Sequence, residues 1–365
     1  MADPRVVYTL PVGKESYTAE FKDLLVTPTR TIYVLNAGVV HLNITFLSPI
    51  EPDDIIRQSF PFGYVFVDVA SSDGAAHRVQ VYSDLTGEWL STASNVQIEW
   101  STSTSPGILT HFANLSLINR LQEFNEMCQD AVFYHATDPR GVSGVTWQTE
   151  WADTLRSGFL THGYLKNTKD TRFRNIDDKF PAFAFSHDLG QVTSTQSVVY
   201  AVGLARDPVI KLVSEFGSSE LRPYWSTRYN SVDEELQVFL ADAIDAKARA
   251  IKLDNRIQTE ALKISPFYRD LVSVATRQTL AAVETVVGPS PGSIYMFMKD
   301  VGSSTRVSPV ETLYAAFPAF LYINSTWCQY LLEPLLQYQS SSQYTKFYAA
   351  PDLGMSLIDH TLSGH

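Results

Sequence analysis

Cysteine is scarce in this sequence: Cys128 and Cys328 are the only two among 365 residues. They lie 200 positions apart, so two separate thiols are a better expectation than a disulfide. Positive charge is also in short supply, with 28 basic against 39 acidic residues and a net charge of −11. Because no basic run offsets this balance, we expect neither nucleic acid nor an anionic membrane as a partner.

Long hydrophobic runs are missing as well. The longest nearly apolar stretch near the core, Ala315–Ile323, is far too short to span a bilayer and contains Pro318. The first residues, Met1–Arg5, lack the apolar segment of a signal peptide, so the chain is either cytosolic or lacks its true beginning. With 45% apolar and 12% aromatic residues, the sequence predicts a soluble globular protein long enough for two domains.

Several catalytic signatures are absent too. The sequence has no H-E-x-x-H, no histidine pair four residues apart and no C-x-x-C, so we predict no metal site. It has no P-loop and no G-x-G-x-x-G, so we predict no cofactor. The histidines nearest to a carboxylate in sequence, His135, His187 and His360, fit a structural role better than a catalytic one.

What the first half of the sequence does contain is strands. Thr31–Leu35 and Val39–Leu47 are rich in β-branched and aromatic residues, and Val96–Trp100 alternates cleanly. Ser72–Gly74 is typical of a hairpin turn between the strands on either side, because Asp and Gly tolerate φ > 0. We therefore predict an antiparallel β-sandwich domain over residues 1–205.

The hydrophobic period then changes from 2 to 3.6, which predicts a helical domain over residues 206–365. A capping box at Ser231–Glu234 opens one helix, and Ser265 with Pro266 opens a second that stops at Gly288–Pro289. A third helix is expected to begin at Asn324. The second helix is expected to bury five apolar side chains: Leu271, Val274, Ala275, Ala282 and Val286.

The remaining candidates for chemistry are carboxylates after the strand-like run Ile294–Met298. Asp300, Glu311 and Asp352 stand at the edges of apolar segments, where a cleft could hold acid–base groups. Two carboxylates can divide the acid and base roles of a hydrolysis. A carboxylate at the end of a strand or helix is also commonly a cap or a solvated group, so the residues alone leave both interpretations open.

Three glycosylation sequons occur, at Asn43, Asn114 and Asn324. We treat each as a candidate glycosylation site. Asn324 has a structural alternative, because it stands where the N-cap of the third helix is expected.

Several stretches taken together resemble one family, and their order holds from about residue 30 to 354. The matching segments are Pro52–Tyr64, Val79–Asp84, Glu88–Trp89, Asn175–Phe185, Asp188–Gly190, Phe297–Asp300, Val310–Tyr314, Pro318–Asn324, Leu331–Leu336 and Asp352–Gly354. The chain resembles the secreted fungal glutaminases of the glutaminase A type. The resemblance implies an N-terminal β-sandwich followed by an (α/α)6 toroid of six helical hairpins. It also implies extracellular hydrolysis of L-glutamine to L-glutamate and ammonia.

If the site lies where the helical domain meets the sandwich, Asp352 and Glu311 are the acid–base candidates. Lys299 and Asp300 would position the substrate, because glutamine carries a carboxylate and an ammonium that need paired charges. The expected partner is thus a small molecule, and the sequence leaves the oligomeric state open.

The sequence departs from the family in ways that predict a truncated chain. Family members are about twice as long, so the toroid is expected to stop after its first hairpins. Pro351 stands where the family tends to have His, Glu311 where it tends to have Asp, and the segment after Gly354 differs. An opened ring exposes apolar helix faces, so aggregation, a partner or an inactive fragment is expected.

Two alternatives stay open. A sandwich with a toroid is also a glycoside hydrolase architecture, and a sugar site would need exposed aromatic residues. The candidates for that role are Trp89, Trp147, Trp151, Trp225 and Trp327. The second alternative is a non-catalytic β-sandwich interaction module whose helical tail docks on another chain.

Overall fold

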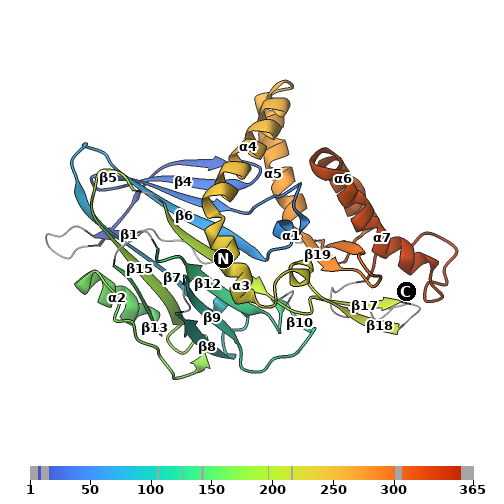
Figure 1. Ribbon diagram of the computed structural model, residues 1–365, viewed down its shortest axis with the longest axis horizontal. Helices are drawn as coiled ribbons and strands as arrows, with labels where there is room; N and C mark the ends of the chain where they lie inside the picture. The colour runs from blue at the N-terminus through green and yellow to red at the C-terminus, as the bar shows by residue number, and fades with distance from the viewer. Residues whose placement is uncertain are drawn as a thin grey trace.

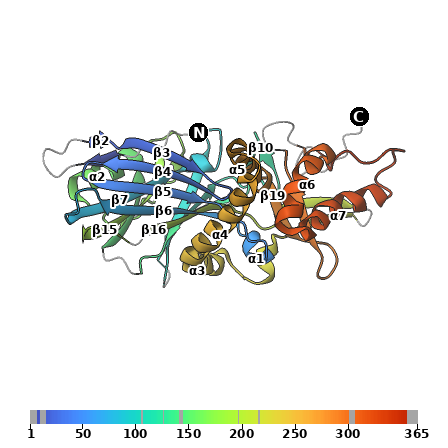
Figure 2. The same cartoon turned by 90° about the horizontal axis from the view of Figure 1, so that it is seen from above.

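The computed structural model describes residues 7–9, 16–104, 107–125, 127–140, 144–195, 197–214, 217–300 and 306–354. Antiparallel sheets occupy one end of an elongated molecule, and helices with short strand pairs occupy the other (Figures 1 and 2). This is the predicted order of an antiparallel β region followed by helices. The toroid arrangement of those helices stays a prediction.

The larger sheet has nine strands in the order β14-β8-β9-β12-β16-β6-β5-β4-β3, and all neighbours pair antiparallel. Its strands are β3 (Glu20–Val26), β4 (Arg30–Ala37), β5 (Val40–Leu47), β6 (Phe62–Ser71), β8 (Gln97–Ser103), β9 (Leu109–Leu115), β12 (Val132–Thr137), β14 (Arg174–Asn175) and β16 (Val198–Ala205). Along β6 buried and partly buried residues alternate, as expected of a strand with one face in a core.

The second layer is a three-stranded sheet with the order β13-β15-β7. It contains β7 (His77–Thr86), β13 (Val145–Trp151) and β15 (Pro181–Val192), and helix α2 (Ala152–His162) packs on it. Phe183 and Phe185 of β15 are fully buried against Phe133 and Tyr200 of the larger sheet. Large aromatic side chains between two sheets bury much apolar area, so this interface is the core of the sandwich.

The predicted hairpin around residues 72–74 is wrong, although the turn itself forms. Asp73 Oδ1 accepts a hydrogen bond from Ala75 N at 2.9 Å, and Gly74 has φ +77°. The flanking strands do not pair with each other: β6 pairs with β5 and β16, whereas β7 pairs with β15. The turn carries the chain from one sheet to the other, because long-range strand partners, not turn residues, decide the pairing.

Four two-stranded ladders complete the described strands. They are β1 (Val7–Thr9) with β2 (Ser16–Thr18), β10 (Glu123–Phe124) with β11 (Met127–Cys128), β17 (Ile210–Ser214) with β18 (Gly217–Leu221), and β19 (Val283–Val287) with β20 (Ile294–Met298). The strand predicted at Ile294–Met298 is therefore confirmed. The ladder of β17 with β18 lies after residue 205, in the range where the hydrophobic period predicted helices.

The larger helices are α3 (Val232–Ala241), α4 (Ala243–Leu262), α5 (Pro266–Ala281), α6 (Val310–Asn324) and α7 (Thr326–Ser340), and a short α1 (Ile55–Gln58) precedes β6. Two starts are confirmed by their caps. Ser231 Oγ accepts from Glu234 N at 3.2 Å, and Ser265 Oγ accepts from Tyr268 N at 3.0 Å ahead of Pro266.

One predicted helix limit is wrong, and one helix was not predicted. The second helix ends at Ala281, and Val286 lies buried on β19 because its β-branched segment pairs with β20. The helix predicted to begin at Asn324 is α7, which begins two residues later, and Asn324 Oδ1 accepts from Thr326 N at 2.9 Å. The helix that was not predicted is α6, which ends at Asn324. The short apolar run 315–323 fits a strand or a helix equally well, and Pro318 lies inside α6.

Helix α5 also buries a different face from the one predicted. Leu271 and Val274 are 64% and 44% exposed, whereas Ser273, Thr276 and Thr279 are buried. Gln258 Nε2 of α4 donates to Ser273 Oγ at 3.3 Å, so the small polar face packs on α4. Small side chains allow close helix approach, and this leaves the apolar stripe of α5 facing solvent.

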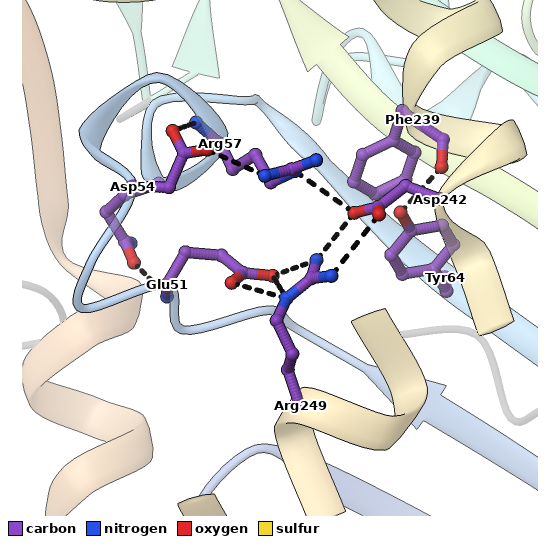
Figure 3. A network of polar contacts seen from close by, with 8 residues as sticks. Glu51, Asp54, Arg57, Tyr64, Phe239, Asp242 and Arg249 are labelled. Atoms are coloured by element: carbon purple, nitrogen blue, oxygen red, sulfur yellow. Dashed lines mark hydrogen bonds and ion pairs between the residues drawn. The ribbon is translucent and has the colours of Figure 1, made fainter. Parts of the chain in front are cut away.

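Helices α3 and α4 are fastened to the larger sheet through a buried seam. Phe239 of α3 stacks on Tyr64 with ring centroids 3.8 Å apart, and the Tyr64 hydroxyl donates to Phe239 O at 2.7 Å. Beside them Arg249 of α4 pairs with Glu51 at 2.7 Å and with Asp242 at 2.5 Å (Figure 3). These contacts join the helices to the loop that follows β5 and to β6.

Candidate functional site

Two predicted acid–base residues meet at one arginine. Arg306 Nη2 donates to Glu311 Oε1, and Arg306 Nη1 lies 3.3 Å from Asp352 Oδ2. Asp352 is 46 positions further along the chain, so only the fold brings it to this arginine. We call Arg306, Glu311 and Asp352 the carboxylate centre.

Backbone hydrogen bonds place the segment carrying Asp352 beside the segment carrying Arg306. Val307 N donates to Gly354 O and Leu353 N donates to Val307 O, both at 2.8 Å, while Val310 N donates to Pro351 O at 2.9 Å. Val307 and Leu353 are buried in the same apolar cluster. These hydrogen bonds and the buried side chains beside them fix the two segments that carry Arg306 and Asp352 relative to each other.

Ser308 redirects the chain between Arg306 and helix α6. It is fully buried with φ +49°, a left-handed conformation that non-glycine residues adopt rarely. Its backbone N–H donates to Met298 O at 2.6 Å, and its Oγ accepts from Met298 N at 3.3 Å. This turn starts α6 two residues later, so Glu311 stands in the first turn of the helix.

The electrostatics of the centre differ between its members. The Arg306 guanidinium holds the pKa of Glu311 below its usual value, and the Glu311 carboxylate in turn raises the pKa of Arg306. The Glu311 side chain is 60% exposed and that of Asp352 19%. Glu311 therefore stays ionised and suits a base or an anionic contact better than an acid, whereas Asp352 is the more enclosed carboxyl.

Of the two residues predicted to position substrate, Lys299 points elsewhere. Lys299 Nζ pairs with Glu123 Oε2 at 2.8 Å, where both side chains are nearly buried. Asp300 stays near the centre: its backbone N donates to Arg306 O at 2.9 Å, and its negative charge raises the pKa of Glu311 slightly against the effect of Arg306. The structure thus brings Asp300, Glu311 and Asp352 together and directs Lys299 toward Glu123 on β10.

Arg306 is the residue that sequence reasoning missed. It follows a run of mostly polar residues in the sequence and matches no motif, and its two partners lie 5 and 46 positions away. A basic residue five positions before Glu311 was the one local signal, and such spacing is too common to single it out.

The two cysteines are free thiols, as predicted. Burial raises the pKa of both Cys128 and Cys328, so neither is a ready thiolate.

The sequons lie in different surroundings. Asn43 is exposed on β5, and Asn114 is partly buried on β9, where its Nδ2 donates to Leu115 O at 2.9 Å. Asn324 Nδ2 donates to Pro52 O at 2.7 Å, and a glycan attached to this nitrogen would compete with that contact. Asn43 is the most accessible candidate, and glycosylation at all three stays a prediction.

The histidines near carboxylates have structural surroundings where the structure describes them. His135 and His187 are buried in the sandwich, and His187 contacts Thr137 and the Tyr200 hydroxyl, each at 3.2 Å. Burial lowers the pKa of His187 to about 4. Asp188 pairs with Arg78 at 2.7 Å. His360 lies outside the described residues.

The tryptophans do not gather at one surface. Trp225 and Trp327 are buried in separate places, whereas Trp151 stacks under Lys179 Nζ, 3.1 Å from the ring centroid. A hollow of about 200 Å³ between the sandwich and α3 is lined by Ile108, Arg140 and Gln237 among others, and it contains no tryptophan. This arrangement does not favour the sugar-binding alternative.

Within the described ranges, no three His, Cys, Asp or Glu side chains are grouped so that they could hold a metal ion. Among the same residues, no helix is both long and apolar enough to cross a membrane.

Comparison with protein families defines the class of the chain. A model described as a domain of unknown function, DUF5127, matches residues 29–260, and the chain belongs to this family. A second model, described as the glutaminase A six helical-hairpin domain, matches residues 265–357. The border between the two falls at the turn between α4 and α5. The predicted boundary at residue 205 is a separate hypothesis that stays a prediction.

Two curated relatives give the particular type. The chain is 32% identical over 332 residues to a protein of Aspergillus oryzae named "Glutaminase A", covering 90% of this chain and 48% of that protein. It is 30% identical over 340 residues to an Arthroderma benhamiae protein named as a probable glutaminase, covering 89% of this chain and 38% of that one. With the two family models, these matches identify a chain of the glutaminase A type. It spans less than half the length of both relatives.

Proposed function

We propose that this chain has a glutaminase-like function, the hydrolysis of the side-chain carboxamide of L-glutamine to L-glutamate and ammonia. The observation that carries the proposal is that two relatives named as glutaminases match about nine-tenths of the chain. The carboxylate centre lies within the region matched by the six helical-hairpin model. Extracellular action, as implied for secreted fungal glutaminases, belongs to the same proposal.

The carboxylate centre can supply the chemistry that the reaction needs. In the proposed mechanism, a carboxylate takes a proton from water as the water oxygen attacks the amide carbon. A carboxylic acid then gives a proton to the leaving nitrogen, so that the C–N bond breaks and ammonia departs. Glu311, which the Arg306 guanidinium holds in its ionised form, is assigned the base role, and Asp352 is assigned the acid role.

The substrate's charged ends are assigned to the neighbouring residues. Asp300 is proposed to meet the ammonium of glutamine. Lys299 can meet the carboxylate only by exchanging its contact with Glu123 for the substrate. The guanidinium of Arg306 lies in the centre, where its two terminal nitrogens face Asp352 and Glu311.

Ammonia release from L-glutamine by the purified 365-residue chain tests the proposal. We expect release that falls on the order of 10²-fold or more in Asp352→Asn, the usual effect of removing a general acid or base. An Asp207→Asn variant is the matched control, because Asp207 pairs with Arg222 on an exposed part of the surface. A folded chain that releases no ammonia would overturn the proposal.

A second candidate function is a non-catalytic interaction module, and one observation favours it. Large apolar side chains are exposed on the C-terminal part, among them Phe267, Leu271, Tyr314 and Phe347. Exposed apolar patches commonly mark association sites. Light scattering distinguishes the outcomes: a module is monodisperse or binds a partner, whereas uncovered helix faces without a partner give concentration-dependent aggregates.

A further inference from the structure

The two carboxylates of the centre share a single cation, and this arrangement sets how they can act. Arg306 Nη2 binds Glu311 and Arg306 Nη1 faces Asp352, so the two nitrogens at the end of one planar group each take one carboxylate. A planar, always-charged guanidinium fixes two such partners in direction as well as distance, which a lysine ammonium does not.

We propose that Arg306 is the positioning residue of the carboxylate centre, holding Glu311 and Asp352 side by side so that they work as a base and an acid on one substrate. This inference rests on the proposed function and names a residue for which neither the family resemblance nor the comparisons give a role.

The backbone around Arg306 is built as a support for that role. On one side Arg306 O accepts from Asp300 N, and immediately after it Val307 is tied at both its N–H and its carbonyl to the segment 353–354. The buried left-handed Ser308 then turns the chain into α6. Strained, buried residues persist where the surrounding structure over-determines them, and they concentrate at functional sites.

The charges that face Glu311 agree with a base held in its ionised form. Arg306 lowers its pKa, the first turn of α6 places backbone N–H groups nearby, and Asp300 opposes both with a smaller effect. Asp352 faces the same guanidinium from the other side. Removing the Arg306 charge must therefore move the pKa of Glu311 upward.

The sign of the pH effect on activity follows. A base works only when ionised, so activity falls as the pH drops through its pKa. In Arg306→Met the pKa of Glu311 rises, and the acidic limb of the kcat/KM profile moves to higher pH. A purely structural arginine would change the amount of folded protein without moving that limb.

The experiment compares wild type with Arg306→Met, Arg306→Lys and the control Arg222→Met, which removes an exposed arginine from its partner Asp207. We expect kcat/KM for glutamine to fall on the order of 10-fold to 100-fold in Arg306→Met, because a small misplacement of catalytic groups is that damaging. Arg306→Lys should restore the position of the acidic limb but only part of the rate. Arg222→Met should resemble wild type.

A second readout does not depend on activity. Carboxyl-carbon NMR of the folded chain follows the titration of Glu311, and its pKa should rise in Arg306→Met and stay unchanged in Arg222→Met. An unchanged Glu311 titration in Arg306→Met overturns the inference even if the wild type releases ammonia. Absence of ammonia release from a wild type whose Glu311 responds as expected overturns the proposed function instead, so the two failures are distinguishable.

Discussion

Arg249 and Arg306 each hold two carboxylates, and the main difference between the two groups is the exposure of one glutamate, Glu51 or Glu311. Arg249 joins Glu51 and Asp242, whose side chains are 8% and 14% exposed, at the seam between sandwich and helices (Figure 3). Arg306 joins Glu311 and Asp352, which are 60% and 19% exposed. The same chemistry thus serves to fasten two parts of the chain in one place and leaves a carboxylate accessible to solvent in the other.

The difference teaches that burial, not the residue types, separates a structural ion cluster from a candidate site. Glu51 lies 198 positions from Arg249, and the contact holds α4 to the loop after β5. A buried carboxylate that loses its cation stays charged without water to solvate it, whereas an exposed carboxylate is solvated by water. Only the second kind can exchange its partner for a substrate.

The largest expected effect on stability comes from removing the arginine at the seam between the sandwich and the helices. Arg249→Met should lower the free energy of unfolding by about 3–5 kcal/mol, because it leaves the buried Glu51 without a cation. Arg306→Met should lower it by much less, because the exposed Glu311 carboxylate returns to water when its cation is removed. Urea unfolding followed by circular dichroism measures both, and similar losses in the two variants would contradict the comparison.

A smaller effect is expected from acid on any one of three buried histidines in the sandwich. Burial lowers the pKa of His111 and His135 to about 3, and that of His187 to about 4, from the usual 6.5. The unfolded chain takes up protons as the pH falls through 6.5, while the folded histidines stay neutral until the pH approaches their lowered values. Stability is therefore complete above pH 6.5 and is lost below it, by about 2 kcal/mol for each histidine at pH 5.

The measurement is the urea midpoint of wild type and His135→Leu between pH 7 and pH 5. The variant should lose less stability than wild type over this interval, by about 2 kcal/mol. Parallel curves for the two proteins would show that His135 is not held neutral by the fold.

These contrasts also mark what the sequence could predict. Ser231 and Ser265 begin their helices as expected, because a capping hydroxyl and its N–H partner lie within one turn of chain. The β-then-α order followed from hydrophobic periods that are equally local. The turn at Asp73 was correct, but the partner of β7 is β15, about a hundred residues away, which no local pattern contains.

The candidate site shows the same limit. Asp352 and Glu311 were proposed from resemblance and residue type, and the fold does bring them to one place. Arg306 was not predicted, because its contact with Asp352 forms only when the fold brings residues 351–354 beside it. Lys299 faces Glu123 of β10, and the two residues are 176 positions apart in the sequence. Helix α5 was assigned the wrong face because a small polar surface is a better fit for α4 than its apolar stripe.

The smallest expected effect tests that inverted helix. Leu271→Lys should change the free energy of unfolding by no more than about 0.5 kcal/mol, since Leu271 is largely exposed. It should also reduce association seen by light scattering. Leu331→Ala, at a fully buried position of α7, is the control and should cost about 2–5 kcal/mol. A large loss in Leu271→Lys would mean that the apolar stripe is covered.

The most direct test of the account is the kcat/KM for ammonia release from L-glutamine, measured across pH for wild type, Asp352→Asn and Arg306→Met together. The account predicts measurable release, a loss on the order of 10² in Asp352→Asn, and an acidic limb displaced to higher pH in Arg306→Met. Release that is unchanged in both variants would place the chemistry away from the carboxylate centre and contradict the account.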